Sequence, residues 1–163
     1  MGEYWYKREN FEDQIDKFFN ESTDPAIVLD YTIGVRDFVT SGNAAAQIKL
    51  TLKKLGVDPA ILRRTAIAVY EAEINMTAHA QGGELKCNVF PDCVHIVCHD
   101  LGPGIKDIEQ SMVPGYSTAE DLVREMGFGA GLGLPNIKKN TDLLHIISGE
   151  GERTYLEIII YFE

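Results

Sequence analysis

The chain has 163 residues, 45 % of them apolar and 25 % charged, and its formal net charge is −10. This length suits one well-buried domain, and no run approaches the roughly 18 apolar residues that a membrane span requires. Acidic residues outnumber basic ones and no Lys/Arg cluster is present to contact phosphates, which argues against nucleic acid as a partner.

The start of the chain and its cysteines bear on the compartment. The first residues show no basic segment followed by an apolar stretch, so we expect no export signal, no membrane partner and a cytoplasmic protein. Cys87, Cys93 and Cys98 form an odd set without C-x-x-C spacing, which argues against disulfides. Cys93, His95 and His99 would share one face of a strand and leave a zinc site open, although small buried thiols are the simpler interpretation.

Residues 1–25 are expected to form an N-terminal extension built around an amphipathic helix. Apolar side chains recur at helical spacing and acidic residues lie between them: Phe11, Ile15, Phe18 and Phe19. The Asp24-Pro25 pair ends this helix. It either covers part of its own domain or offers a surface to a partner or to a second copy in a homodimer. Residues 26–163 form the main domain in this interpretation.

Hydrophobic periodicity and turn residues predict the elements of the main domain in chain order. They are a strand at 26–33, helices at 41–55 and 59–80, a hairpin of GELKCNVF and CVHIVCHD, a helix at 134–141, and strands in LLHIIS and RTYLEIIIYFE. Residues 102–131 lack periodicity and are predicted to be a mobile lid with a short helix at 119–125. This order indicates an α+β fold, a two-layer sandwich with helices on one face of a mainly antiparallel mixed sheet.

Two polar side chains lie on one face of the long helix predicted at 59–80. Glu71 and Asn75 are four residues apart and therefore neighbours on the helix surface. The apolar run before Glu71 favours a raised pKa, which suits a general base. The amide oxygen of Asn75 is a suitable hard ligand for Mg²⁺. Taken alone, such a pair is commonplace and has a structural explanation.

Two glycine-containing stretches follow. In DLGPGI, Asp100 ends a strand, where its carboxylate can accept a hydrogen bond from an exocyclic amine, and the glycines allow a close turn. By itself this stretch is also compatible with a simple turn. In GFGAGLGLPNIKK, residues 127–139, four alternating glycines lead into a helix whose backbone N–H groups can face a phosphate.

The combination is more specific than its parts. E-x-x-x-N on a helix, D-x-G-P-G-I after a strand, a lid, and G-x-G-x-G-L-P opening a helix resemble the GHKL ATP-binding fold, where they are the N, G1 and G2 boxes. The resemblance covers roughly residues 26–162. Within this superfamily the motifs are most similar to the small anti-sigma factor serine/threonine kinases of bacterial partner switching, which phosphorylate STAS-domain proteins. Glu71 stands where histidine kinases more usually have Asn.

By position, the resemblance implies Glu71 as general base, Asn75 as Mg²⁺ ligand and Asp100 as the residue that recognises adenine. It also implies further ATP-binding positions beside Asn75 and Asp100: Gly102, Gly104, Ile105, Ser117, Thr118, Gly129, Gly131, Leu132 and Gly133. Lys138 and Lys139 are expected on a solvated helix face. The segment AEDLVREMGF lengthens the lid, and the N-terminal helix lies outside the family's core.

Three functions are compatible with this resemblance. The first is an ATP- and Mg²⁺-dependent serine/threonine protein kinase that phosphorylates a STAS-domain partner. The second is an ATP-controlled binding module, an anti-sigma factor that sequesters a sigma factor or another regulator without significant kinase activity. The third, which Glu71 disfavours, is the catalytic domain of a split histidine kinase.

Overall fold

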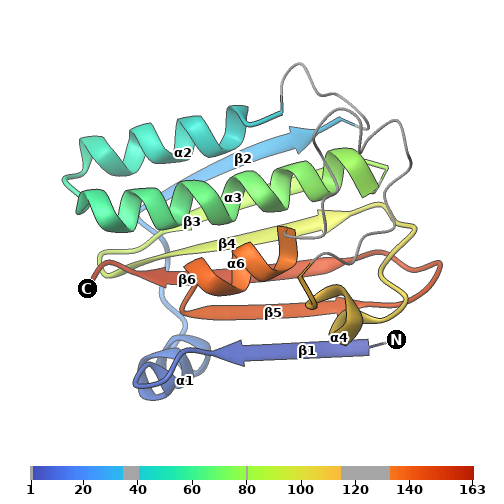
Figure 1. Ribbon diagram of the computed structural model, residues 1–163. Helices are drawn as coiled ribbons and strands as arrows, with labels where there is room; N and C mark the ends of the chain where they lie inside the picture. The colour runs from blue at the N-terminus through green and yellow to red at the C-terminus, as the bar shows by residue number, and fades with distance from the viewer. Residues whose placement is uncertain (1, 35–40, 80, 115–132) are drawn as a thin grey trace.

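The computed structural model describes residues 2–34, 41–79, 81–114 and 133–163, and shows one six-stranded sheet (Figure 1). Its strands are β1 (Gly2–Lys7), β2 (Ile27–Ile33), β3 (Gly83–Val89), β4 (Cys93–Asp100), β5 (Leu143–Ser148) and β6 (Tyr155–Tyr161). They are ordered β1-β5-β6-β4-β3-β2, and each of the five described pairings is antiparallel. The α+β class is confirmed, whereas the mixed character expected of the sheet is not found among these strands.

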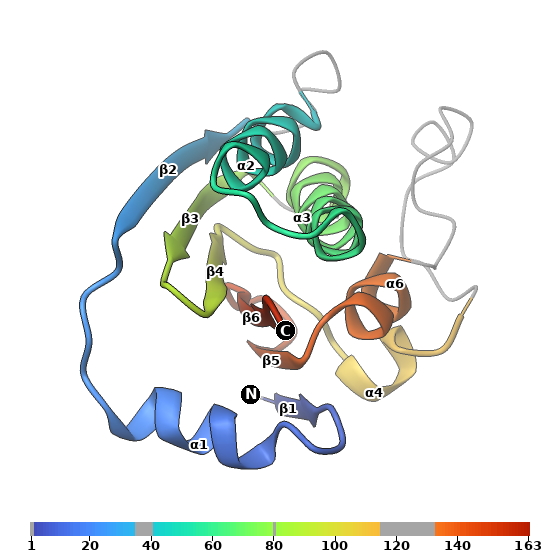
Figure 2. The same cartoon turned by 90° about the vertical axis from the view of Figure 1, so that its left-hand side faces the viewer.

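Helices cover the two faces of the sheet unequally. On one face lie α2 (Asn43–Lys54), α3 (Pro59–His79), α6 (Gly133–Asn140) and the single turn α4 (Ile108–Ser111) (Figure 2). The helix α1 (Glu12–Asn20) of the N-terminal extension packs against the opposite face, whereas the described helices of the main domain share one face as expected. None of the described helices combines the length and the apolar character needed to cross a bilayer.

Alternation along the strands divides the apolar residues between two cores. Even-numbered positions of β4, such as Val94, Ile96 and Cys98, face α2 and α3 and belong to the main core. A smaller core lies under α1 on the other face, where Ile15 is fully buried beside Phe90, Cys93, Leu143, Ile159 and Tyr161. The N-terminal helix therefore covers part of its own sheet, which is one of the two alternatives that its sequence left open.

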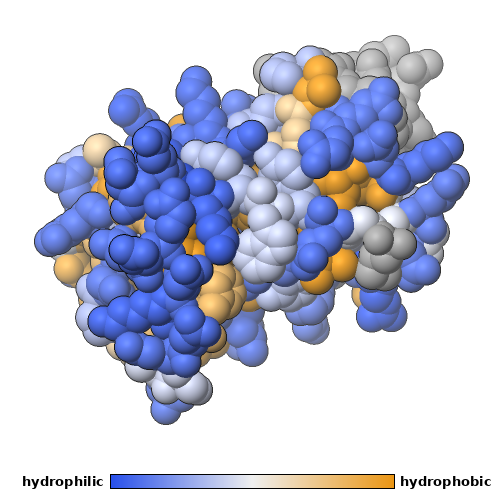
Figure 3. All heavy atoms as spheres, turned by 90° about the horizontal axis from the view of Figure 1, so that it is seen from below, coloured by the Kyte–Doolittle hydropathy of each residue, from blue (hydrophilic) through white to orange (hydrophobic). Residues whose placement is uncertain are grey.

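The N-terminal segment also contains a strand that hydrophobic periodicity did not reveal. Gly2–Lys7 pairs with β5 as the edge strand of the sheet, with Trp5 opposite His145. The Nζ atom of Lys138 in α6 lies over the rings of Tyr4 and Tyr6, at 5.1 Å from the Tyr6 centroid. This lysine is therefore not on the freely solvated helix face that the sequence predicts. On the surface seen from the β1 side, hydrophobic residues form small separate patches among hydrophilic ones (Figure 3). The division of the chain at residue 26 and a homodimer stay predictions.

Two further expectations can be compared with the described residues. The short helix predicted at 119–125 lies outside them, and the helical turn found after the glycine-containing loop is α4. The alternative of a zinc site gains no support, because no group of three or more His, Cys, Asp or Glu suited to a metal occurs in the described part of the chain. Burial raises the pKa of the Cys87 and Cys98 thiols to about 12, in line with buried thiols.

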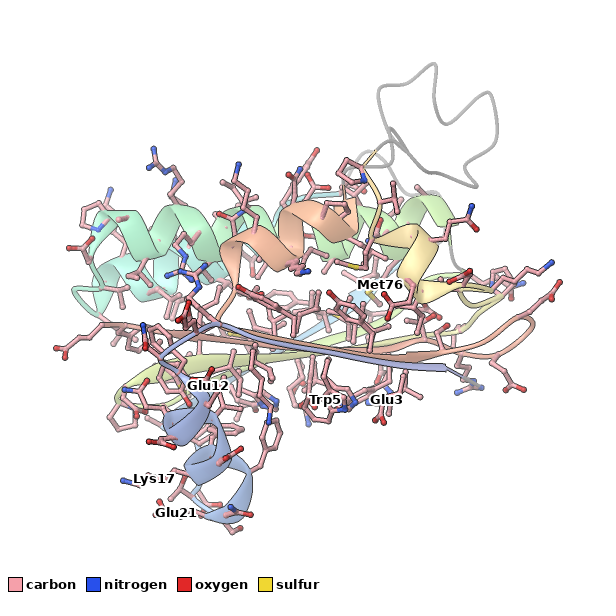
Figure 4. The ribbon with its side chains drawn as sticks, turned by 60° about the horizontal axis from the view of Figure 1, so that its bottom comes forward. Glu3, Trp5, Glu12, Lys17, Glu21 and Met76 are labelled. Carbon is pink, nitrogen blue, oxygen red and sulfur yellow. The ribbon has the colours of Figure 1, made fainter. Side chains whose placement is uncertain are left out.

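A polar network crosses the face of the sheet opposite to α2 and α3. Glu157 accepts hydrogen bonds from His95 at 2.8 Å and from His145 at 2.7 Å. The other nitrogen of His145 lies 2.8 Å from the Glu3 carboxylate, and the Trp5 ring stacks on the imidazole with centroids 3.6 Å apart. Trp5 and Glu3 both point away from α2 and α3 (Figure 4). This network links β1 to the centre of the sheet.

Candidate functional site

Two glutamates of the long helix α3, Glu71 and Glu73, have different surroundings. Glu73 is 2 % exposed, and its carboxylate accepts hydrogen bonds from the backbone N–H groups of Gly42, Ala44 and Ala45 at the start of α2. Residues two apart on a helix point in different directions, so Glu71 faces another side of α3. Glu73 is therefore occupied as the cap of α2, and Glu71 is the acidic side chain directed toward α6.

Glu71 is half-buried where α3 meets α6. Burial raises the pKa of its carboxyl above the ordinary glutamate value, and a side-chain hydrogen bond with Asn136 of α6 partly offsets this rise. The direction agrees with the expectation from the apolar sequence that precedes this residue. A carboxylate with a raised pKa is a better proton acceptor, which is the property required of a general base.

Asn75 lies one turn after Glu71 and meets the start of α6. A Cβ atom placed on Gly133 would lie 3.0 Å from Asn75 Oδ1 and 3.4 Å from Glu71 Oε2. A side chain at position 133 would therefore crowd the Asn75 oxygen and contact the Glu71 carboxylate, and glycine permits this close approach. The site consequently combines a carboxylate, an amide oxygen and the N-terminal end of an eight-residue helix, whose first N–H groups have no partner within the helix.

Asp100 ends β4 and is held in place by backbone groups. Its Oδ1 atom accepts hydrogen bonds from the N–H of Gly102 and from the N–H of Thr154, each at 2.9 Å. Both described bonds use the same oxygen of the carboxylate. The geometry gives Asp100 a fixed orientation, which is useful for a residue that reads a hydrogen-bond donor on a ligand.

The glycines after Asp100 have a structural explanation of their own. Gly102 and Gly104 adopt φ of +98° and +89°, and a Cβ on Gly104 would collide with the backbone oxygens of Gly149 and Glu152 in the turn between β5 and β6. Ile105 follows and donates its N–H to Ser148 Oγ at 2.8 Å. This loop is therefore packed tightly against the β5–β6 turn, and its glycines would be needed even without a ligand.

A shallow groove of about 350 Å³ runs between α2 and α3 and reaches Glu71. Small and apolar side chains line it, with a lysine at its rim: Gly42, Ala45, Ala46, Lys49, Ala66, Ile67, Tyr70 and Glu71. Tyr70 is 41 % exposed at this groove. The candidate base is thus approachable from the outer surface of the helical layer.

The structure brings the described candidates to one end of the molecule. The C-terminal half of α3, the end of β4 and the start of α6 lie together there (Figure 1), with Glu71, Asn75 and Gly133 in mutual proximity. Five candidates lie outside the described residues: Ser117, Thr118, Gly129, Gly131 and Leu132. Sequence reasoning missed Asn136, Glu73 and Thr154, because each acts through a partner that is distant along the chain.

Comparison with known proteins agrees with this arrangement. No protein-family model matches the chain. It is 31 % identical over 111 residues to the serine/threonine-protein kinase RsbT of Bacillus subtilis (strain 168), which covers 66 % of this chain and 77 % of RsbT. The chain belongs to the GHKL family of anti-sigma factor kinases.

Two anti-sigma factors support the same family. The anti-sigma F factor of Oceanobacillus iheyensis is 28 % identical over 124 residues, covering 71 % of this chain and 82 % of the relative. The anti-sigma F factor of Clostridium novyi is 35 % identical over 81 residues, covering 44 % and 57 %. The family expected from the N, G1 and G2 motifs is thereby confirmed, and its members are expected to bind ATP.

Proposed function

We propose that this chain is a Mg²⁺- and ATP-dependent serine/threonine protein kinase that phosphorylates a STAS-domain protein in a bacterial partner-switching system. The observation that carries the proposal is the position of Glu71: a half-buried carboxylate with a raised pKa, placed beside Asn75 and the start of α6. The kinase relative supports a catalytic role for a site of this kind.

The residues present fit a metal–nucleotide complex. Asn75 offers a hard amide oxygen of the type that Mg²⁺ accepts, and Gly133, which has no Cβ, lets the start of α6 approach this oxygen closely. The start of α6 supplies backbone donors and the positive end of a helix dipole. Asn75 would hold the metal, which neutralises phosphate charge, and Asp100 would accept the hydrogen bond of the adenine amine.

Glu71 would act on the acceptor hydroxyl. Its carboxylate takes the proton of a Ser or Thr hydroxyl while that oxygen bonds to the γ-phosphorus and the bond to the ADP oxygen breaks. The products are the phosphorylated partner and ADP, with the proton on Glu71. The groove between α2 and α3 ends at this carboxylate, so we assign it to the segment of the partner that carries the hydroxyl.

The deciding experiment is intact-mass measurement of STAS-domain proteins from the source genome after incubation with this protein and Mg-ATP. We expect one added phosphoryl group, and a rate at least about 100-fold lower with Glu71→Ala, since a lost general base typically costs a factor of 10² to 10⁴. Nucleotide binding by Glu71→Ala should persist. Full transfer by this variant would remove Glu71 as the base.

A second function is favoured by the relatives named as anti-sigma F factors. In this alternative the chain is an ATP-controlled binding module that sequesters a sigma factor or other regulator. Bound ATP without transfer to any STAS protein, together with nucleotide-dependent capture of a sigma factor, would support it. Acid-labile phosphohistidine in the product would instead indicate the catalytic domain of a split histidine kinase. A cytoplasmic location stays a prediction under each alternative.

A further inference from the structure

Ser148 joins two segments that flank Asp100. It ends β5 and is 1 % exposed. Its Oγ atom accepts the backbone N–H of Ile105 at 2.8 Å and lies 2.7 Å from Oγ1 of Thr154, which is also buried. A single hydroxyl therefore links the loop that follows β4 to the residue that precedes β6. Ser148 belongs to none of the three motifs that the sequence contains.

Thr154 in turn holds Asp100 through two backbone contacts. Its N–H donates to Asp100 Oδ1 at 2.9 Å, and its carbonyl oxygen accepts the N–H of Asp100 at 3.0 Å. Ser148 contacts the side chain of the same threonine. A series of direct contacts thus runs from the Ser148 hydroxyl through Thr154 to the Asp100 carboxylate.

The loop after Asp100 depends on the same hydroxyl at its other end. A Cβ on Gly104 would collide with the backbone oxygens of Gly149 and Glu152, so the loop lies directly against the β5–β6 turn. The N–H of Ile105 is held in this position by Ser148 Oγ. A half-buried N–H that loses its acceptor is unfavourable, so without this oxygen the loop would shift to find another partner.

The orientation of Asp100 has a consequence for the choice of base. Gly102 and Thr154 both donate to Oδ1, and Oδ2 has no bond to the part of the chain that the structure describes. Oδ2 is thus the oxygen that a ligand can meet. Adenine presents an amine donor at its position 6, whereas guanine presents an acceptor oxygen there. A carboxylate oxygen fixed in one place therefore attracts the first base and repels the second.

We propose that Ser148 is a positioning residue for base recognition: its hydroxyl fixes Thr154 and Ile105, and through them holds Asp100 in the orientation that favours adenine over guanine. This inference deepens the proposed function and rests on it, since Asp100 can select a base only when a nucleotide binds. The hydrogen bonds themselves exist without a nucleotide, so the contact and its effect on binding can be measured separately.

The first test is amide hydrogen exchange, followed by NMR in the full chain without nucleotide. In Ser148→Ala we expect the Ile105 amide to exchange about 10-fold faster or more, because its acceptor is gone. Ser111→Ala is the matched control: its hydroxyl donates to the backbone oxygen of Asp107 in α4, and its loss should leave the Ile105 rate unchanged. An unchanged rate in Ser148→Ala would overturn the proposal.

The second test compares the Kd values for Mg-ATP and Mg-GTP by calorimetry. Ser148→Ala should bind ATP about 10-fold more weakly and GTP almost as the wild type does, so the preference for ATP falls. A residue that only stabilised the fold would not alter this ratio. Thr154→Val removes the other hydroxyl at nearly constant volume and should also lower the preference, whereas Thr154→Ser keeps the hydroxyl and should retain it.

The outcomes separate the inference from the proposed function. A wild-type preference for ATP that persists in folded Ser148→Ala, or in Thr154→Val if the alanine variant does not fold, would overturn the role of Ser148 and leave the proposed function intact. A wild type that binds neither nucleotide would overturn both. A preference that falls in Ser148→Ala and Thr154→Val but not in Thr154→Ser would uphold the inference.

Discussion

At the scale of single residues, burial and hydrogen bonding assign different roles to acids that look alike in the sequence. Glu71 and Glu73 are two residues apart, yet one faces α6 with a raised pKa and the other caps α2. Asp100 ends β4 and Asp107 comes soon after it, yet the first is fixed by the N–H groups of Gly102 and Thr154, and the second caps the short helix α4. Residue type alone does not separate these roles.

The proposed adenine contact gives a residue-scale prediction. Asp100→Asn should weaken ATP binding about 10-fold or more, because an amide nitrogen replaces one of the two acceptor oxygens and cannot accept from the adenine amine. Isothermal titration calorimetry with ATP measures this. Asp107→Asn, the same substitution in the loop just beyond, is the control and should bind ATP like the wild type. Equal affinity in both variants would rule out Asp100 as the adenine reader.

At the scale of elements, α2 depends on its neighbour for its N-terminal cap. Gly42 occupies the cap position with φ of +96° and offers no side chain, so the Glu73 carboxylate of α3 accepts instead from the N–H of Gly42 and from two N–H groups in the first turn of α2. Such orphan donors must be satisfied when a helix end is buried. The orientation of α2 relative to α3, and with it the groove that reaches Glu71, is coupled to this contact.

This arrangement predicts a stability difference between two neighbouring substitutions. Glu73→Gln should lower the free energy of unfolding by about 1–2 kcal/mol, because a buried charge-assisted cap becomes a neutral one with a single acceptor oxygen. Urea unfolding at fixed pH measures the change through the transition midpoint. Glu71→Gln is the matched control and should unfold close to the wild-type midpoint. A reversed order would show that the cap contributes little.

At the scale of the whole molecule, the N-terminal segment completes one edge of the sheet and covers part of one face. β1 extends the sheet edge, α1 covers the second core, and the network of Glu3, His145, Glu157 and His95 joins β1 to the central strands. Arg8 and Arg64 both pair with the buried Asp142, at 3.3 Å and 3.0 Å, so the same segment is also tied to α3. Ion pairs as well as apolar packing therefore hold the N-terminal segment against the rest of the domain.

The pH dependence of stability should report this network. Burial alone would raise the pKa of Glu157, but the hydrogen bonds from His95 and His145 outweigh burial, and the net pKa is lowered. A carboxyl whose pKa is lower in the folded than in the unfolded state contributes stability above the unfolded value, and loses it as the pH falls. Stability should therefore decline as the pH is lowered through and below the ordinary glutamate range.

Urea unfolding of the wild type and of Glu157→Gln across this pH range checks the prediction. The variant should be less stable near neutral pH, and its stability should fall less steeply on acidification, because position 157 no longer titrates. Glu150→Gln, in the turn that follows β5, is an exposed control and should retain the wild-type slope. A variant slope as steep as that of the wild type would exclude Glu157 as a source of the acid sensitivity.

Local sequence pattern and motif spacing were sufficient to predict the fold class and the family of this protein. Alternation in β3 and β4, the periodic helices, and the spacing of Glu71, Asn75 and Asp100 predicted the α+β class and the family, since these signals depend on residues near one another in the chain. Only the tertiary structure decided which partners meet: Asn136 at Glu71, Glu73 at the start of α2, and Gly104 against the β5–β6 turn. It also revealed β1, because a short edge strand obtains its hydrogen bonds and its packing from β5, at the other end of the sequence.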